Sequence, residues 1–422
     1  MAEAGPLDGA TLELDVGGPA HGGSCVARHG DPTSGRAVFV RHALPGERVR
    51  AVVTEDRGGS YCFADAVEIV SAAPERVEPP CPHAGPGRCG GCDWQHASGA
   101  AQRALKETVI RDQFTRLARL ELGDLLGGVE ELPGGLLGWR SRILWALDRD
   151  GAHGLRKHRS HDLEPIDHCP LAQSDIADFP VLAGDADLGR ATGVEQALGT
   201  EPEAALLVHS PGSGRQARGR RPPDRLRVVR GPEVLHHDVR GRTFGVQAGG
   251  FWQVHPAAAE TFAAALLDAV APRPGEHVLD LYAGAGALTA PLAEAVGPLG
   301  SVLGVESAAA AVADAAANLA DLPNASVQRA RVTAESLAAL EQSPDVIVLD
   351  PPRAGAGREV MQALMALAPR VIGYVACDPA ALARDTAVAL SAGWRLTSLR
   401  AFDAFPMTHH VECVARFEPP SG

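Results

Sequence analysis

A cysteine and a glutamate stand beside two apolar segments near the C-terminal end of the sequence. Cys377 follows the apolar segment 371–376 and precedes Asp378 and Pro379, where a helix is expected to begin. A helix N-terminus lowers the pKa of a thiol and favours the nucleophilic thiolate, whereas the Asp378 carboxylate raises that pKa. Burial beside apolar residues would raise the pKa of Glu412 and suit it to removing a proton. The pair predicts covalent attack on an electrophilic ring, although a free cysteine is most often inert.

A glycine-rich turn follows the apolar segment 277–281. Gly284 and Gly286 permit a tight turn and a close approach of the backbone to a ligand. Glu306 ends the next apolar segment 20 residues later (306 − 286), the spacing at which an acid reaches ribose hydroxyls. The third glycine of a dinucleotide fingerprint is absent, so the pattern favours a nucleoside without a pyrophosphate, such as S-adenosylmethionine. The alternative is that these glycines only allow the chain to turn after a strand and bind no ligand.

Asp350 ends another apolar segment, residues 346–349, and two prolines follow it. From about residue 250 onward, such apolar segments alternate with helical patterns, which predicts βαβ units and a parallel sheet. Ligands of open α/β folds bind at the carboxyl ends of the strands. Because an unpaired buried charge is costly, we expect Asp350 to be a binding residue rather than a structural one.

Four cysteines form a candidate metal site. Cys89 and Cys92 make a C-x-x-C pair, Cys81 precedes it by eight positions (89 − 81), and Cys169 lies much further along the chain. Four thiolates can hold zinc or an iron–sulfur cluster, and a C-x-x-C pair can also be redox-active. Flanking glycines and the distant fourth cysteine favour a metal, but spacing does not separate zinc from iron–sulfur.

The N-terminal residues 11–70 contain short alternating apolar segments broken by turn residues, which predicts a small β-barrel. Barrels of this size often bind nucleic acid along a basic face. The alternative is that the arginines of the barrel are ordinary surface charges that contact only solvent. The candidate contacts are Arg41, Arg48 and Arg50 on the barrel and Arg140, Arg142, Arg156, Lys157 and Arg159 in the central segment.

The overall charge excludes a wholly basic binding surface. The net charge is −13, so any nucleic-acid contact must be a local basic path. No apolar segment approaches the roughly 18 residues needed to span a membrane, and the N-terminus lacks the pattern of a signal peptide. We therefore expect a cytoplasmic monomer in which the eight cysteines are reduced or bind metal.

Together these motifs resemble the S-adenosylmethionine-dependent RNA 5-methyluridine methyltransferases of the uracil-C5 family. The branch most similar is the large-subunit rRNA type, which carries an N-terminal TRAM domain and a [4Fe–4S] cluster. The resemblance covers nearly the whole chain and implies three parts. These are an OB-like TRAM β-barrel over residues 1–72, a central iron–sulfur α+β domain over 73–246, and a Rossmann-like class I methyltransferase domain over 247–422.

The resemblance also implies roles for individual residues. The runs Cys377-Asp378-Pro379 and His410-Val411-Glu412 match the nucleophile and base motifs, with Asp378 where asparagine is usual. Cysteines 81, 89, 92 and 169 match the cluster ligands. The cofactor-binding positions implied are Gln253, Tyr282, Gly284, Gly286, Glu306 and Asp350.

The reaction implied is methyl transfer to C5 of a uridine in RNA. Cys377 would add to C6 of the ring, and Glu412 would remove the C5 proton after methylation. The target base must be unstacked, as in a loop. The TRAM domain and cluster favour rRNA over tRNA, although a tRNA enzyme stays open. A radical methylthiotransferase would use a C-x3-C-x2-C motif, which is absent, and a noncatalytic RNA-binding or ribosome-assembly factor would not need both Cys377 and Glu412.

Overall fold

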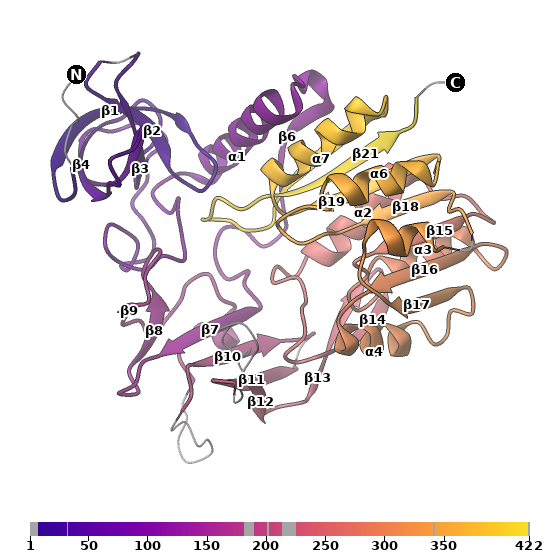
Figure 1. The fold of residues 1–422 in the computed structure, drawn as a ribbon. Coiled ribbons are helices and arrows are strands. Elements are labelled where there is room, and N and C mark those ends of the chain that lie inside the picture. Colours follow the sequence, from indigo (N-terminus) through magenta and orange to yellow (C-terminus); the bar gives the residue numbers. More distant parts are fainter. Residues whose placement is uncertain are drawn as a thin grey trace.

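The computed structural model describes residues 7–31, 33–180, 190–200, 202–212, 225–340 and 342–420. The described residues form a barrel, an antiparallel central sheet and a large mixed α/β sheet (Figure 1). Within the described residues, no helix is long and apolar enough to cross a membrane.

The N-terminal part is a closed five-stranded barrel, as the alternating pattern predicted. Its strands are β1 (Thr11–Pro19), β2 (Cys25–His29), β3 (Arg36–Arg41), β4 (Arg48–Glu55) and β5 (Tyr61–Ser71), in the order β1-β2-β3-β5-β4. Alternate residues of each strand face inward, so that Leu12, Leu14 and Val49 are buried in the barrel core while their neighbours face solvent.

The central part is built on a six-stranded sheet in the order β12-β11-β10-β7-β8-β9. Trp139, Ile143 and Trp145 are buried in its core. A separate hairpin follows and packs against a helix of the C-terminal part. The sheet strands are β7 (Arg142–Leu147), β8 (His153–Arg156), β9 (Leu163–Glu164), β10 (Gly193–Leu198), β11 (Ala204–Ser210) and β12 (Arg225–Arg230), and the hairpin is β13 (Val234–Val239) with β14 (Arg242–Gln247).

The C-terminal part contains an eight-stranded sheet in the order β17-β16-β15-β18-β19-β21-β20-β6. The first five are parallel, and β21 runs antiparallel to both its neighbours. The strands are β6 (Leu126–Glu131), β15 (His277–Leu281), β16 (Ser301–Glu306), β17 (Ala325–Arg329), β18 (Val346–Leu349), β19 (Val371–Ala376), β20 (Arg395–Asp403) and β21 (Glu412–Glu418). Every residue of β18 and β19 is buried, as expected for parallel strands covered on both faces.

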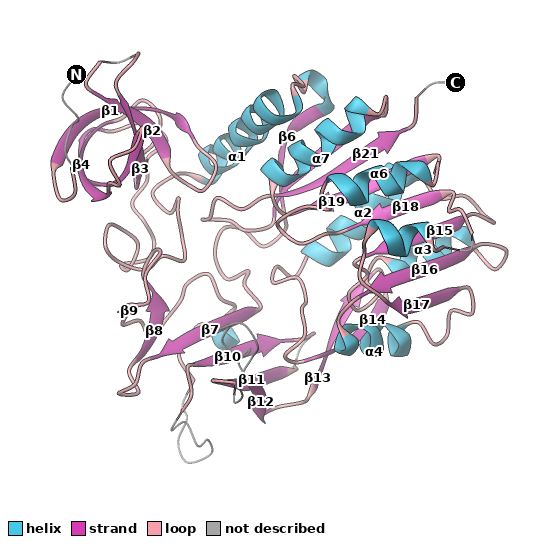
Figure 2. Ribbon diagram, viewed as in Figure 1, coloured by secondary structure: helices cyan, strands magenta, loops and turns pink. Residues whose placement is uncertain are grey.

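Helices cover both faces of this sheet (Figure 2). The helices are α1 (Gly99–Gln113), α2 (Ala258–Val270), α3 (Thr289–Val296), α4 (Ala309–Asn318), α5 (Ala334–Ala338), α6 (Arg358–Ala366) and α7 (Pro379–Ser391). One hydrophobic core packs α1, α5, α6 and α7 against the sheet, and two further cores pack α2, α3 and α4 against it. The predicted parallel sheet is therefore present, extended by an antiparallel strand.

Part of the segment expected to form the central domain, residues 73–246, packs with the C-terminal sheet instead. Strand β6 pairs with β20, and α1 packs against α7, so residues 99–131 lie with the C-terminal sheet (Figure 1). The physical reason is the apolar face of α1, whose Ile110 joins Phe114 in the same core as Leu382 of α7. The chain thus enters the C-terminal layer before it builds the central sheet.

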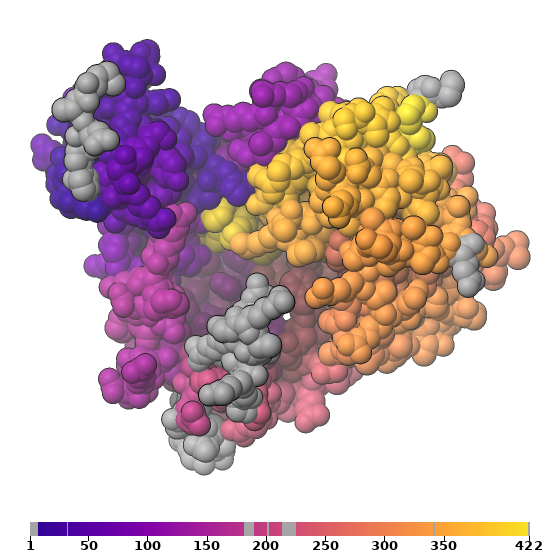
Figure 3. All heavy atoms as spheres, viewed as in Figure 1, coloured from indigo at the N-terminus to yellow at the C-terminus, as the bar shows by residue number. Residues whose placement is uncertain are grey.

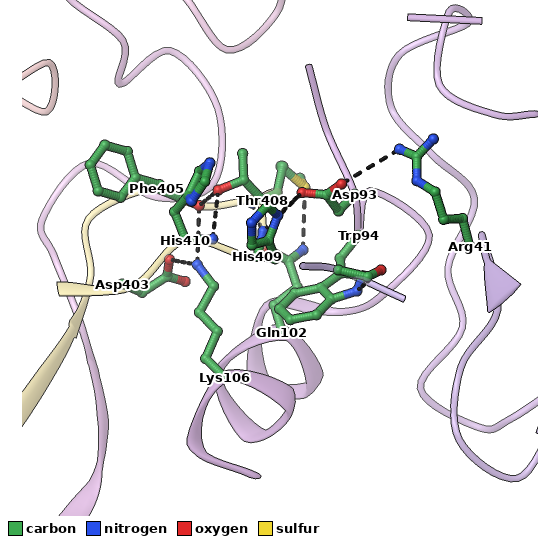
Figure 4. Close-up of polar contacts among 12 residues, drawn as sticks. Arg41, Asp93, Trp94, Gln102, Lys106, Asp403, Phe405, Thr408, His409 and His410 are labelled. Carbon is green, nitrogen blue, oxygen red and sulfur yellow. Dashed lines mark hydrogen bonds and ion pairs between the residues drawn. The ribbon is translucent and has the colours of Figure 1, made fainter. Parts of the chain in front are cut away.

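A buried ion pair connects α1 to the loop that joins β20 to β21. Lys106 Nζ lies 2.5 Å from Asp403 Oδ1, and it also donates to the Phe405 carbonyl at 3.1 Å (Figure 4). Both side chains are almost inaccessible to solvent. Burial lowers the pKa of Lys106 and the Asp403 carboxylate opposes that change.

Removing Lys106 should destabilise the C-terminal part. The Lys106→Ala change leaves the Asp403 carboxylate buried without its counter-charge, at a cost of about 3–5 kcal/mol. Differential scanning calorimetry should show a large fall in the unfolding temperature. Arg116→Ala is a matched control, because Arg116 forms an exposed pair with Asp112 and such pairs contribute about 0.5 kcal/mol. Equal effects of the two changes would contradict the assignment.

Candidate active site

Strands β19 and β21 bring Cys377 and Glu412 together. The two strands are antiparallel, with Ala376 opposite Cys413, so the next residue of β19 faces the preceding residue of β21. Cys377 follows β19 and Glu412 begins β21. The register therefore places the thiol and the carboxylate at the same end of neighbouring strands.

The environment disfavours the charged form of both groups. Burial, followed by the negative charges of Glu412, Asp350 and Asp378, raises the pKa of the Cys377 thiol to about 12, while Arg353 opposes this change. Burial also raises the pKa of Glu412 well above its usual value, and Asp350 adds to this rise. An elevated carboxylate pKa is what a general base working near neutral pH requires.

Asp378 and Pro379 begin α7 as predicted. The Asp378 side chain accepts a hydrogen bond from the Ala381 amide at 2.7 Å, and the proline occupies the first helical turn. This cap ends β19 sharply and fixes the backbone immediately after Cys377. The net effect on the thiol is a raised pKa, and its main causes are burial and the neighbouring carboxylates.

The glycine turn lies after β15, and Glu306 holds it in place. Glu306 Oε2 accepts from the Gly284 amide at 3.2 Å, and Oε1 accepts from the amides of Ser307 and Ala308 at 2.6 and 2.7 Å. Tyr282 adopts a left-handed conformation with φ of 64°, which turns the chain at the end of the strand. The structure thus brings the predicted acid and the predicted turn into direct contact.

Two further carboxylates lie beneath this turn. Asp280 is fully buried and accepts from the Thr289 hydroxyl at 2.5 Å, while its other oxygen has no hydrogen-bond partner among the described residues. Burial raises the pKa of Asp280 to about 7, and burial together with the charge of Asp280 raises the pKa of Asp350 to about 7. Perturbed carboxylates at the carboxyl edge of a parallel sheet mark a ligand site. The sequence analysis did not assign Asp280, although it stands one residue before the end of β15.

Gln253 lies half-buried in the segment between β14 and α2. The neighbouring Trp252 stacks on His237 and packs in one core with Leu319, whose side chain also contacts Gly286. This packing brings the predicted Gln253 segment to the side of the glycine turn.

The loop after Asp350 is held by a residue that the sequence analysis missed. Asp385 of α7 accepts from the Tyr374 hydroxyl at 2.7 Å and from the Ala356 and Gly357 amides at 2.8 and 3.1 Å. Nothing in the sequence singles out this aspartate, because its partners lie on different elements. It fixes the loop that carries Arg353 toward Cys377.

A second network fixes the loop before Glu412 (Figure 4). Asp93 accepts from His409 Nδ1 at 2.6 Å and from the His409 amide at 3.1 Å, and Arg41 lies 3.5 Å from the same carboxylate. The Met407 amide donates to Gln102 Oε1 at 2.7 Å. Asp93 and Gln102 carry no recognisable motif, since they act on a loop about 300 residues away (409 − 93 = 316).

The four predicted cluster cysteines belong to one neighbourhood. The thiols of Cys81, Cys89 and Cys92 each interact electrostatically with that of Cys169. The Gln95 amide donates to Cys92 Sγ at 3.0 Å and the Gly91 amide donates to Cys89 Sγ at 3.4 Å. In the part of the chain that the structure describes, no group of three or more side chains is arranged to hold a single metal ion. Four thiols with N–H donors to sulfur nevertheless fit the donor set of an iron–sulfur cluster.

The arginines proposed for a basic face differ in their surroundings. Arg41 is buried against Asp93, so the expectation that it contacts RNA is wrong. Arg48 and Arg50 are exposed but pair with Glu13 and Glu68 on the barrel. In the central part, Arg142 pairs with Glu195, and Arg159 lies over the Phe63 ring at 4.7 Å.

The fold and this site define a methyltransferase-type α/β domain joined to an N-terminal barrel. Residues 233–418 match the family model described as tRNA (Uracil-5-)-methyltransferase, and residues 7–67 match that of the TRAM domain. An RNA methyltransferase of Streptomyces avermitilis is 45% identical over 97% of this chain and 99% of its own length. A 23S rRNA (uracil(1939)-C(5))-methyltransferase RlmD of Alkalilimnicola ehrlichii is 34% identical over 96% of both chains.

A solved structure shares the whole architecture. The tRNA (uracil-54, C5)-methyltransferase of Pyrococcus abyssi, in complex with S-adenosyl-L-homocysteine, superimposes with a TM-score of 0.68 over 96% of this chain and 100% of that chain, at 20% identity. At this identity the likeness shows the fold alone. The chain belongs to the family of S-adenosylmethionine-dependent RNA (uracil-5-)-methyltransferases that carry a TRAM domain.

Proposed function

We propose that this protein methylates C5 of a uridine in 23S rRNA through a covalent bond between Cys377 and C6 of the base. The observation that carries the proposal is the register of β19 and β21, which sets Cys377 opposite Glu412 next to Asp350. A nucleophile and a base at one sheet edge, beside a nucleoside turn, match the two halves of this reaction.

In the proposed mechanism, the Cys377 thiol loses its proton, and the resulting thiolate adds to C6 and moves an electron pair of the C5–C6 bond toward C5 and the O4 carbonyl. Bound S-adenosylmethionine supplies an electrophilic methyl group. After C5 has gained that methyl, the Glu412 carboxylate removes the C5 proton, and the returning electron pair breaks the C6–sulfur bond. Arg353 favours the thiolate, because it opposes the rise in the Cys377 pKa.

The residues present suit the cofactor. Glu306 lies at the end of β16 against the Gly284 amide, where a carboxylate can bind ribose hydroxyls. Asp280 retains one buried oxygen without a partner beneath the turn. We propose that Gln253, Tyr282, Gly284, Gly286, Glu306 and Asp350 bind S-adenosylmethionine.

Variants of the two proposed catalytic residues should stop the reaction at different steps. Cys377→Ala should bind RNA and form no adduct, whereas Glu412→Gln should stall after methylation with the base still bonded to sulfur. That conjugate should survive denaturing electrophoresis and form only when S-adenosylmethionine is present, because addition to C6 is reversible until C5 is methylated. Turnover by Glu412→Gln at the wild-type rate would remove Glu412 from the mechanism.

Cys413 provides the matched control for this experiment. It lies next to Glu412, is fully buried, and has a pKa raised by burial. Cys413→Ala should leave adduct formation intact. An adduct formed by Cys377→Ala but not by the Cys377→Ala, Cys413→Ala double variant would assign the nucleophile to Cys413. The absence of any methylation or adduct in the wild-type protein would instead favour a noncatalytic RNA-binding factor.

The RNA substrate is inferred from the relatives and the barrel. The RlmD proteins of Alkalilimnicola ehrlichii and Shewanella baltica, named for 23S rRNA, are 34% and 32% identical over at least 96% of this chain. Mapping of 5-methyluridine in RNA from cells with and without this protein should show loss of one 23S rRNA position and no loss in tRNA. A loss confined to tRNA would assign the alternative substrate.

We propose that Cys81, Cys89, Cys92 and Cys169 hold a [4Fe–4S] cluster. The Gln95 and Gly91 donors to sulfur support this, because hydrogen bonds to thiolate sulfur stabilise such clusters. Protein purified without oxygen should contain iron and sulfide and absorb in the visible range, and Cys169→Ser should lose both. Cys62→Ser, which alters a buried barrel thiol, is the control. Stoichiometric zinc without sulfide would contradict the cluster.

A further inference from the structure

A loop of the N-terminal barrel contacts Asp378, the residue next to the proposed nucleophile Cys377. His21 lies in the loop between β1 and β2, and its Nε2 is 2.9 Å from Oδ2 of Asp378. The two residues are 357 positions apart, and both side chains are only partly exposed. In the described residues, this contact joins the N-terminal barrel directly to the turn that presents Cys377.

Both oxygens of the Asp378 carboxylate are occupied. Oδ1 accepts from the Ala381 amide at 2.7 Å and caps α7, while Oδ2 meets His21. A carboxylate held at both oxygens cannot rotate, and its charge is shared with two donors. The cap fixes the helix start, whereas the imidazole fixes the side of the turn that faces the barrel.

The position of His21 is itself well defined. Trp94 Nε1 donates to the Gly23 carbonyl at 3.1 Å, and a Cβ at Gly23, whose φ is 87°, would lie 2.8 Å from the Asp93 carboxyl carbon. Only glycine allows this close approach. His21 also makes an edge contact with His409, with ring centroids 6.4 Å apart. The barrel loop therefore contacts the same elements that hold the loop between β20 and β21. In Figure 3 the indigo barrel lies beside yellow atoms of the C-terminal part.

The charges around Cys377 explain why this contact matters. Glu412 from β21, Asp350 after β18, and Asp378 all disfavour the thiolate, and Arg353 opposes them. Of the three carboxylates, Asp378 is the one that interacts with His21, and Arg384 of α7 also acts on it. A donor on Asp378 places the positive end of its dipole beside the carboxylate and so partly screens the charge that the thiolate must face.

We propose that His21 is a positioning residue for the nucleophile: the barrel delivers an imidazole that holds the Asp378 carboxylate and partly offsets its charge beside Cys377. The inference deepens the proposed methyl transfer, since it assigns to the RNA-binding type of domain a direct part in preparing the thiol. Docking of the barrel and activation of Cys377 are then coupled through one side chain.

Alkylation of Cys377 tests this proposal without RNA. Iodoacetamide reacts with thiolates, and peptide mass spectrometry reports the rate at Cys377 alone between about pH 7 and 9.5. His21→Ala should slow the reaction roughly threefold, which corresponds to a rise of about 0.5 in the pKa of the Cys377 thiol, as expected for a partly exposed pair. His21→Gln, which keeps a neutral donor, should recover part of the rate.

A double variant separates charge compensation from simple docking. Asp378→Asn removes the charge and should speed alkylation, and adding His21→Ala to it should cause no further change. His29→Ala, at an exposed end of β2, is the barrel control and should leave the rate unchanged. An unchanged rate in His21→Ala, or an equal loss in the Asp378→Asn background, would overturn the proposal. If the alkylation pattern holds but no RNA is methylated, the proposed function fails and the positioning role stands.

Discussion

The buried ion pair between Lys106 and Asp403 is the interaction on which the loop between β20 and β21, which leads to Glu412, depends. The loop between β20 and β21 lies outside any strand or helix, and side chains of α1 and Asp93 bond several of its backbone groups. Met407 adopts a left-handed conformation within it, which persists only where surrounding contacts determine it. Without these contacts, the start of β21 and therefore Glu412 would lose its fixed relation to Cys377.

The same sheet edge concentrates groups that are unfavourable for stability. Asp280, Asp350 and Glu412 all have raised pKa values because burial penalises their charged forms. For each, the folded pKa exceeds the unfolded one, so its contribution to stability is complete at low pH and is lost as the pH rises through the folded pKa. A fold gains nothing in stability from three such carboxylates at neutral pH. Several buried carboxylates with raised pKa values at one sheet edge are typical of a ligand or catalytic site.

Local signals in the sequence predicted the regular parts of this protein. The strand at residues 277–281 and the strand ending before Cys377 were predicted with their observed bounds, because periodic apolar residues and a following glycine or proline determine them locally. The short helix α5 was missed. The pairing of β6 with β20 was also missed, because the two strands are far apart in the sequence. Arg400 and Glu130, whose side chains join the two strands, are separated by 270 residues. Residues such as Asp385 and His21 act across elements, and no local pattern identifies them.

The division of labour between the domains follows from these long-range contacts. The C-terminal sheet carries Cys377, Glu412 and the glycine turn, yet two of the loops beside them are held by residues from outside it. Asp93, adjacent to the proposed cluster ligand Cys92, holds His409, and the barrel loop holds Asp378. Isolating the C-terminal domain would therefore expose the polar faces of both catalytic loops to water, where competing hydrogen bonds weaken such contacts. The N-terminal third of the chain is thus part of the active-site architecture, and its arrangement constrains how RNA can approach Cys377.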